Sequence, residues 1–187
     1  LHIERLAVGH TMAITGLSYN AAGDAIFTSS LDGTARRFVT ATGAQAFAAT
    51  HGAPIHDVAQ SADGQWLATA GENNLVKIWN ASNGAAGPKT DFAGFTAPVK
   101  SVTFTGDNLR VLAGSAANQV LAFNLATGLV EQLFLEHTGA VEALAVAGEK
   151  GTVVVSSSVD KTVRAWSLAV VRQLAGHTGP VNAVAAI

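Results

Sequence analysis

The residues whose types could support catalysis lie close together in the sequence, at His56, Asp57 and Ser61. A Ser-His-Asp triad needs the histidine between the other two groups, within hydrogen-bond reach of both. His56 and Asp57 are neighbours in an apolar strand pattern, and neighbouring strand residues point to opposite faces of a sheet. The sequence also contains neither a G-x-S-x-G nor an H-E-x-x-H motif. We therefore assign no catalytic residue and no metal site.

A second stretch that could bind a ligand is GAAGPKT, which ends on Lys89 and Thr90 and partly resembles a phosphate-binding loop. Asn83 stands where the first glycine of such a loop belongs, and Pro88 removes a backbone amide that a phosphate would need. The match fails, and the sequence predicts no cofactor. We interpret 80–91 as the longest loop of the chain, an exposed turn rich in small residues.

Most of the histidines belong to a repeat of 40 to 44 residues. An apolar residue follows each repeat marker after four and after seven positions, a turn rich in Gly and Asp comes next, and an aromatic residue ends the third apolar run. Short strand patterns at even spacing, separated by turn signals, predict an all-β fold built from repeats. The markers are His10, His51, Phe95, His137 and His177.

These features resemble the WD-repeat β-propeller family, and the resemblance covers the whole chain. A blade of that family opens with Gly-His, has Ser or Thr in its second strand and Asp in the next turn, and ends its third strand on Trp-Asp. Gly9-His10 and Gly176-His177 match the opening dipeptide, whereas no copy ends on Trp-Asp. The implied fold class is all-β, a propeller of four-stranded antiparallel blades.

The resemblance also implies how the chain is divided. Propeller rings close with about four to eight blades, and the resembled family lies near seven. Four blades with a single extra strand at each end do not make a closed ring, so we expect an incomplete ring whose remainder lies outside this chain. An outer strand of a preceding blade is expected at 3–8, and an inner strand of a following blade at 181–187. The single partial domain, 1–187, is expected to hold blades at 14–50, 55–92, 99–134 and 141–174.

The family's buried network of His, Ser or Thr, Asp and Trp gives the repeated histidines a structural role. A buried imidazole can bridge a hydroxyl group and a carboxylate, which satisfies groups that would otherwise be costly to bury. The resemblance places His137, Ser156, Asp160 and Trp166 in a complete network. It places His51, Thr69, Asn73 and Trp79 in a second, and His10, Thr28 and Asp32 in a third that has Phe38 in the aromatic position. The remaining copy has lost all four, with Phe95, Ala113, Ala117 and Phe123.

The first strand of each repeat carries an irregular pattern. The two apolar residues that recur in every repeat are three positions apart. Side chains alternate between the two faces of a regular strand, so such a strand cannot bury both residues on one face. A bulge at the two positions between them would reconcile the pattern. In the resembled family these positions rim the central channel on the face that binds partners, and the residue before the turn acid joins them. We therefore predict that Thr15, His56, Lys100 and Glu142, with Glu72 beside them, bind a partner.

The predicted function is a non-catalytic scaffold that holds a protein or peptide on this rim. A net charge of −2 gives no electrostatic footprint for nucleic acid or an anionic membrane. No apolar run approaches the ~18 residues of a membrane span. The chain has no cysteine, so its sequence does not indicate an oxidising or a reducing compartment. Two alternatives remain: an interaction appendix of a larger protein with a catalytic domain, and a propeller enzyme that uses His56, Asp57 and Glu142 in its channel.

Overall fold

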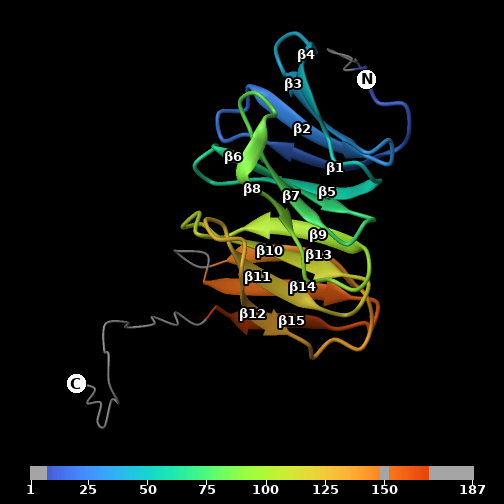
Figure 1. Ribbon diagram of the computed structural model, residues 1–187, viewed down its shortest axis with the longest axis vertical. Helices are drawn as coiled ribbons and strands as arrows, with labels where there is room; N and C mark the ends of the chain where they lie inside the picture. Colours follow the sequence, from blue (N-terminus) through green and yellow to red (C-terminus); the bar gives the residue numbers. More distant parts are fainter. Residues whose placement is uncertain (1–7, 148–151, 169–187) are drawn as a thin grey trace, which may run out of the picture.

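The computed structural model describes residues 8–147 and 152–168, which form β-strands, turns and loops (Figure 1). Within these ranges there is no helix, and hence none long and apolar enough to cross a membrane. The strands form four antiparallel sheets, and within each sheet consecutive strands are neighbours. The first sheet consists of β1 (Ile14–Tyr19), β2 (Ala25–Ser30), β3 (Thr34–Val39) and β4 (Gln45–Thr50).

The next two sheets repeat this order, and the fourth shows three strands in the described residues. The predicted strand at 181–187 and the end of the predicted fourth blade, 169–174, lie outside the described ranges, as does the predicted strand at 3–8 except Val8, which is not in a strand. The second sheet holds β5 (Ile55–Gln60), β6 (Trp66–Gly71), β7 (Val76–Asn80) and β8 (Ala86–Phe92). The third holds β9 (Val99–Phe104), β10 (Arg110–Ser115), β11 (Val120–Asn124) and β12 (Val130–Phe134), and the fourth β13 (Val141–Ala147), β14 (Val153–Ser158) and β15 (Val163–Ser167).

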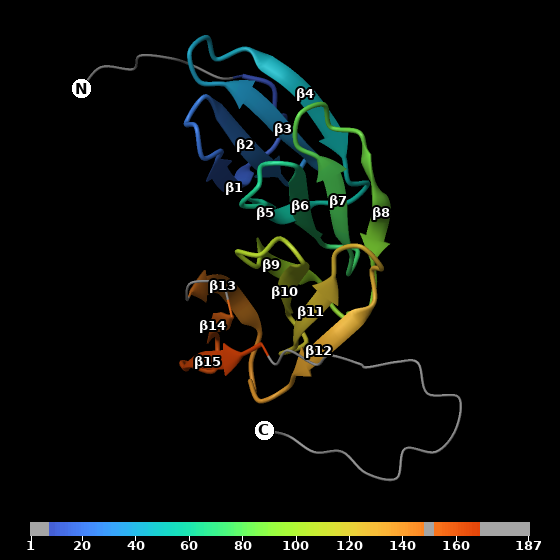
Figure 2. The ribbon, with the colours of Figure 1, turned by 90° about the vertical axis from the view of Figure 1, so that its left-hand side faces the viewer.

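The sheets lie one after another along an arc (Figure 2). The first strands of the sheets, β1, β5, β9 and β13, are successive neighbours and line the inner side. The strands β4, β8 and β12 follow the outer side. The described sheets do not close into a ring, which confirms the predicted fold class of an open, propeller-type arc of antiparallel blades.

Each inner strand contains the bulge that the sequence pattern predicts. In the pairing of β1 with β2, Ile14 lies opposite Ser30 and Gly16 opposite Ser29, so Thr15 is the extra residue. The same shift occurs in the other three inner strands, where the extra residues are His56, Lys100 and Glu142. The bulge lets two apolar residues three positions apart face the same junction between sheets.

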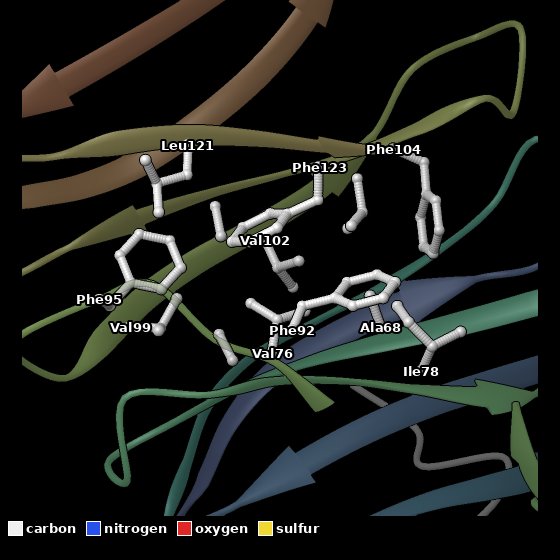
Figure 3. Packing of buried hydrophobic residues seen from close by; sticks show 13 residues of the cluster. Ala68, Val76, Ile78, Phe92, Phe95, Val99, Val102, Phe104, Leu121 and Phe123 are labelled. Carbon is white, nitrogen blue, oxygen red and sulfur yellow. The ribbon is translucent and has the colours of Figure 1, made fainter. Parts of the chain in front are cut away.

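The hydrophobic core is divided among the junctions between neighbouring sheets, because a sheet that has a neighbour on each side buries both of its faces. The cluster between the second and third sheets is rich in phenylalanine (Figure 3). The rings of Phe92 and Phe123 stack with centroids 5.5 Å apart, and Phe95 packs against Phe123 at 5.8 Å. Leu121 and Phe95 lie at one end of this cluster, and Ile78 and Phe104 at the other.

The expectation of a long loop over 80–91 is wrong, because Ala86–Phe92 forms the outer strand β8. Lys77 pairs with Asp91 and Trp79 with Ala86, so two steps along β7 correspond to five along β8. The extra residues of this repeat therefore form a wide bulge, residues 87–90, inside a strand. Phe92 is fully buried at the end of β8, and this apolar anchor holds the strand in the sheet although its composition is typical of a turn.

Candidate functional site

The four bulge residues and Glu72 lie at the end of the sheets where the inner strands begin, a surface that we call the upper rim. Thr15, His56, Lys100 and Glu142 occupy the same place in the register of four successive sheets. Glu72 follows β6, in the turn to β7 of the second sheet. A bulge releases its extra residue from ladder pairing, so that its side chain can be aimed at a ligand.

Three of the five predicted residues form one charged group across the junction of the second and third sheets. Nε2 of His56 lies 2.5 Å from Oε2 of Glu72. Nζ of Lys100 lies 3.3 Å from the same histidine nitrogen and 4.0 Å from the Glu72 carboxylate. The Glu72 side chain remains about half exposed, at 48%, so the group can still exchange one of these contacts for a ligand.

The other two predicted residues are placed differently. The Thr15 hydroxyl donates to the carbonyl oxygen of Ile55 at 2.7 Å and lies 3.0 Å from the Ser29 hydroxyl, so it joins the first sheet to the second. Glu142 is exposed, and no residue in the described part of the chain makes a hydrogen bond or ion pair with its side chain. The five predicted residues thus include one cation, two carboxylates and a histidine.

Sequence reasoning missed the role of the residue after each bulge, which it assigned to the rim. Asp57 turns into the junction instead, where one carboxylate oxygen accepts from the Ser101 hydroxyl and the Val102 amide, both at 3.0 Å. Ser101 in turn accepts from the Leu144 amide at 3.1 Å, which joins the third sheet to the fourth. Burial raises the pKa of Asp57 against the effect of these donors. The sequence signal for this role was the residue type, because the position after each bulge holds a small or a hydrogen-bonding residue.

In the fourth sheet, His137 lies between the Ser156 hydroxyl, at 2.7 Å, and the Asp160 carboxylate, at 2.8 Å. The Trp166 indole donates to the Ser156 oxygen at 2.7 Å. Because a carboxylate only accepts, Nδ1 of His137 donates to Asp160, while the Ser156 oxygen accepts from the indole and also contacts Nε2 of His137. The hydrogen bond from Thr162, with the one from His137, holds the pKa of Asp160 well below its usual range.

The second sheet holds a similar arrangement with the imidazole reversed. Nδ1 of His51 lies 2.8 Å from the Thr69 hydroxyl and Nε2 lies 3.0 Å from the Asn73 side-chain oxygen, while the Trp79 indole donates to Thr69 at 3.0 Å. Burial lowers the pKa of His51, although the hydrogen bond to Asn73 opposes this shift. The neutral imidazole therefore fits this buried position best.

The remaining two sheets have partial or lost networks. In the first, His10 lies 2.7 Å from the Thr28 hydroxyl and 2.9 Å from the Asp32 carboxylate, with Phe38 in the aromatic position. In the third, Phe95 and Phe123 take the places of the histidine and the tryptophan and pack against each other. All four positions of the network are apolar in that sheet, so no member of the network has lost its partner.

No catalytic arrangement is found in the described residues. The Ser61 hydroxyl donates to Asp63 at 2.6 Å, beyond the end of β5 that is opposite to His56, so Ser61, His56 and Asp57 do not form a triad. No group of three His, Cys, Asp or Glu residues in the same ranges could hold a metal ion.

Comparison with known proteins gives a consistent result. The family model described as "WD domain, G-beta repeat" matches residues 3–38, 45–80 and 129–167, more than half of the chain. The chain is 31% identical over 180 residues to "Zinc finger CCCH domain-containing protein 17" of Oryza sativa subsp. japonica, covering 92% of this chain and 39% of that protein. It is 28% identical over 102 residues to "Autophagy-related protein 16" of Arabidopsis thaliana, covering 54% of this chain and 20% of that protein.

Among solved structures, the chain is similar to "Structure of U3-55K", with a TM-score of 0.80 and 26% sequence identity. The match covers 87% of this chain and 51% of that one. The chain thus spans about half or less of the length of these similar proteins. Repeats of this type serve in general as protein-interaction scaffolds without catalytic activity.

Proposed function

The chain belongs to the WD40-repeat family, and from this premise we propose that it is a non-catalytic scaffold whose upper rim binds a protein or peptide. The observation that carries the proposal is the bulge repeated in four inner strands, which brings Thr15, His56, Lys100 and Glu142 to one edge. Rigid sheets that display variable side chains at their ends are suited to recognition, because the scaffold loses little entropy on binding.

The charges on the rim define the type of partner. Lys100 and His56 already share the Glu72 carboxylate, whereas Glu142 lies apart on the next sheet. A partner that places a carboxylate beside Lys100 and a cation beside Glu142 would meet both charges. A single strongly basic or acidic ligand would meet one of them and be repelled by the other.

Reversing the two charges together tests the proposal. The double variant Lys100→Glu and Glu142→Lys keeps the net charge, and we expect partner affinity to fall about tenfold, because two complementary pairs become repulsive. Partners captured on the immobilised 187-residue chain are identified and then titrated against both proteins. The control is Asp24→Lys, a charge reversal in the exposed turn between β1 and β2 at the opposite end of the sheets, which should leave rim binding unchanged. Unchanged capture by the double variant, at unchanged melting temperature, would refute the assignment.

A further inference from the structure

A cavity of about 310 Å³ lies at the end of the sheets opposite to the upper rim, between the second and third sheets. Its apolar walls include Trp66 and Ile78 from the second sheet, and Leu109 and Leu125 from turns of the third. Ile78 also marks this end of the hydrophobic cluster in Figure 3. The volume lies at the low end of the range of about 300–1,000 Å³ for ligand sites, which suits one or two inserted side chains.

The wide bulge in β8 borders the cavity. At the junction of the first and second sheets, a Cβ atom added to Gly84 would lie 2.5 Å from the Phe47 ring, so this aromatic side chain fills the space beside the turn. At the matching glycine of the next junction, Gly128, the neighbours are Phe92 and the aliphatic part of Lys89. The bulge, residues 87–90, thus adds a lysine beside the aromatic ring of this junction, and Lys89 lines the cavity.

The polar groups of the cavity that are available to a ligand are donors. Both charged residues that line it, Lys89 and Arg110, are cations. Arg110 is already paired with Glu131, at 2.5 Å, and with Asp107, at 3.8 Å. Lys89 has no carboxylate within ion-pair distance in the described part of the chain.

Two further donors belong to residues that line the cavity. The Asn108 side-chain oxygen accepts from the Asp63 amide at 3.2 Å, which leaves its NH₂ group without an acceptor among the described residues. The Trp66 indole N–H likewise has none in those ranges. A ligand that complements this cavity must supply acceptors around an apolar group.

We propose that this cavity is a second binding site, which takes a short acidic segment of a partner protein. A large apolar side chain of the segment fills the space between Trp66, Ile78 and Leu109, and a neighbouring carboxylate pairs with Lys89. The NH₂ group of Asn108 and the indole N–H of Trp66 donate to main-chain carbonyls of the segment. The site lies at the opposite ends of the strands from the upper rim, so two partners can bind at the same time.

The probe for the test is a fluorescein-labelled peptide, Gly-Ser-Glu-Leu-Phe-Glu-Ser-Gly, titrated against the full 187-residue chain by fluorescence anisotropy. We expect binding that shifts the Trp66 indole N–H resonance and that weakens about fivefold in Lys89→Glu, because an attractive pair becomes repulsive. Leu109→Ser should weaken it by a similar factor through the lost apolar wall. The matched control is Leu135→Ser, since both leucines are 59% exposed and Leu135 does not line the cavity.

Three outcomes would overturn the proposal. One is no binding of the peptide up to about 1 mM. Another is binding that Lys89→Glu and Leu109→Ser leave unchanged. The third is equal competition by phenylacetate alone, which would point to a small organic acid instead of a peptide. Lys100→Glu should leave this titration unchanged, so failure of the cavity and failure of the rim can be told apart.

Discussion

A difference of one position decides the role of the residues at the start of each inner strand. His56 stands on the bulge and contacts Glu72 and Lys100 at the surface, whereas Asp57 enters the junction and accepts hydrogen bonds from the next sheet. The Asp57 carboxylate is costly to bury, but it satisfies a hydroxyl and two backbone amides, those of Val58 and Val102. The rim and the junction are therefore built from adjacent residues.

The buried histidine of the second sheet should make stability depend on pH. Burial lowers the pKa of His51 below its ordinary value of 6.5, so the unfolded chain takes up the proton first as the pH falls. Stability should therefore fall between pH 7 and pH 5, by at most about 1.4 kcal/mol per pH unit from one proton. In His51→Gln this slope should be smaller, although its stability at pH 7 is about 1–3 kcal/mol lower because Thr69 and Asn73 lose their partner.

Urea unfolding of both proteins at several pH values measures this effect. Above pH 7 His51 is neutral in both the folded and the unfolded chain. The stability curves of the parent and of His51→Gln should therefore run parallel there. Equal slopes for the two proteins between pH 7 and pH 5 would show that His51 does not carry the dependence.

At the scale of elements, the outer strands decide how neighbouring sheets fit together. In the first sheet, Arg37 pairs with Phe47 and Phe38 with Gln45, so β4 has one extra residue, whereas β8 has three in the equivalent region. Beside the smaller bulge the Phe47 ring lies against the next turn, whereas beside the wider one both Phe92 and Lys89 do. A change of length inside a strand thus alters the chemistry of a junction while the turns keep their form.

Alanine variants of two turn glycines can separate the cost of backbone strain from the cost of overpacking at a junction. Gly23 and Gly84 have φ values of 73° and 74°, a region unfavourable for residues with a Cβ atom. A Cβ at Gly23 would meet nothing within 4 Å, whereas one at Gly84 would lie 2.5 Å from Phe47. Gly23→Ala should cost about 1 kcal/mol. Gly84→Ala should cost about 1–3 kcal/mol more through overpacking.

Chemical denaturation of the two alanine variants and the parent chain gives both costs. The difference between the variants isolates the contact with Phe47, because the backbone strain is nearly the same. Equal losses would mean that the Phe47 ring moves aside freely and that the junction is not tightly packed.

At the scale of the whole molecule, the arc exposes at one end a face that the other sheets bury. Ile14 and Leu17 of β1 are 57% and 59% exposed, whereas the matching residues Ile55 and Val58 of β5 are 0% and 4% exposed. The preceding sheet covers β5, and no described sheet covers the corresponding face of β1 (Figure 2). An apolar face of this kind favours association.

The exposed face should make the 187-residue chain self-associate. We expect sedimentation velocity to show larger species as concentration rises, and Leu17→Lys to shift the chain toward the monomer without loss of stability. The matched variant Val58→Lys places the same charge in a covered junction and should unfold the protein. A parent chain that stays monomeric at all concentrations would contradict the expectation.

Much of the architecture could be read from the repeat. The strand order, the antiparallel sheets and the bulge in each inner strand follow from apolar residues at fixed distances from the markers, because burial and strand geometry act locally. Lys100 and Glu142 were placed by the same register. The position of the extra residues in 80–91 could not be read, because small residues with Gly and Pro are typical of a turn and only the buried ring of Phe92 keeps them in a strand.

The sequence by itself determined the all-β repeat and the residues that can occupy each place in a blade, since these depend on side-chain type and spacing along the chain. The tertiary structure alone decided which of those side chains meet. It brings Asp57 to Ser101 across a junction, sets Lys89 above an open cavity, and leaves Ile14 exposed where Ile55 is covered. Each of these depends on a neighbouring sheet about one repeat away, and contacts at that distance are set by packing and not by local pattern.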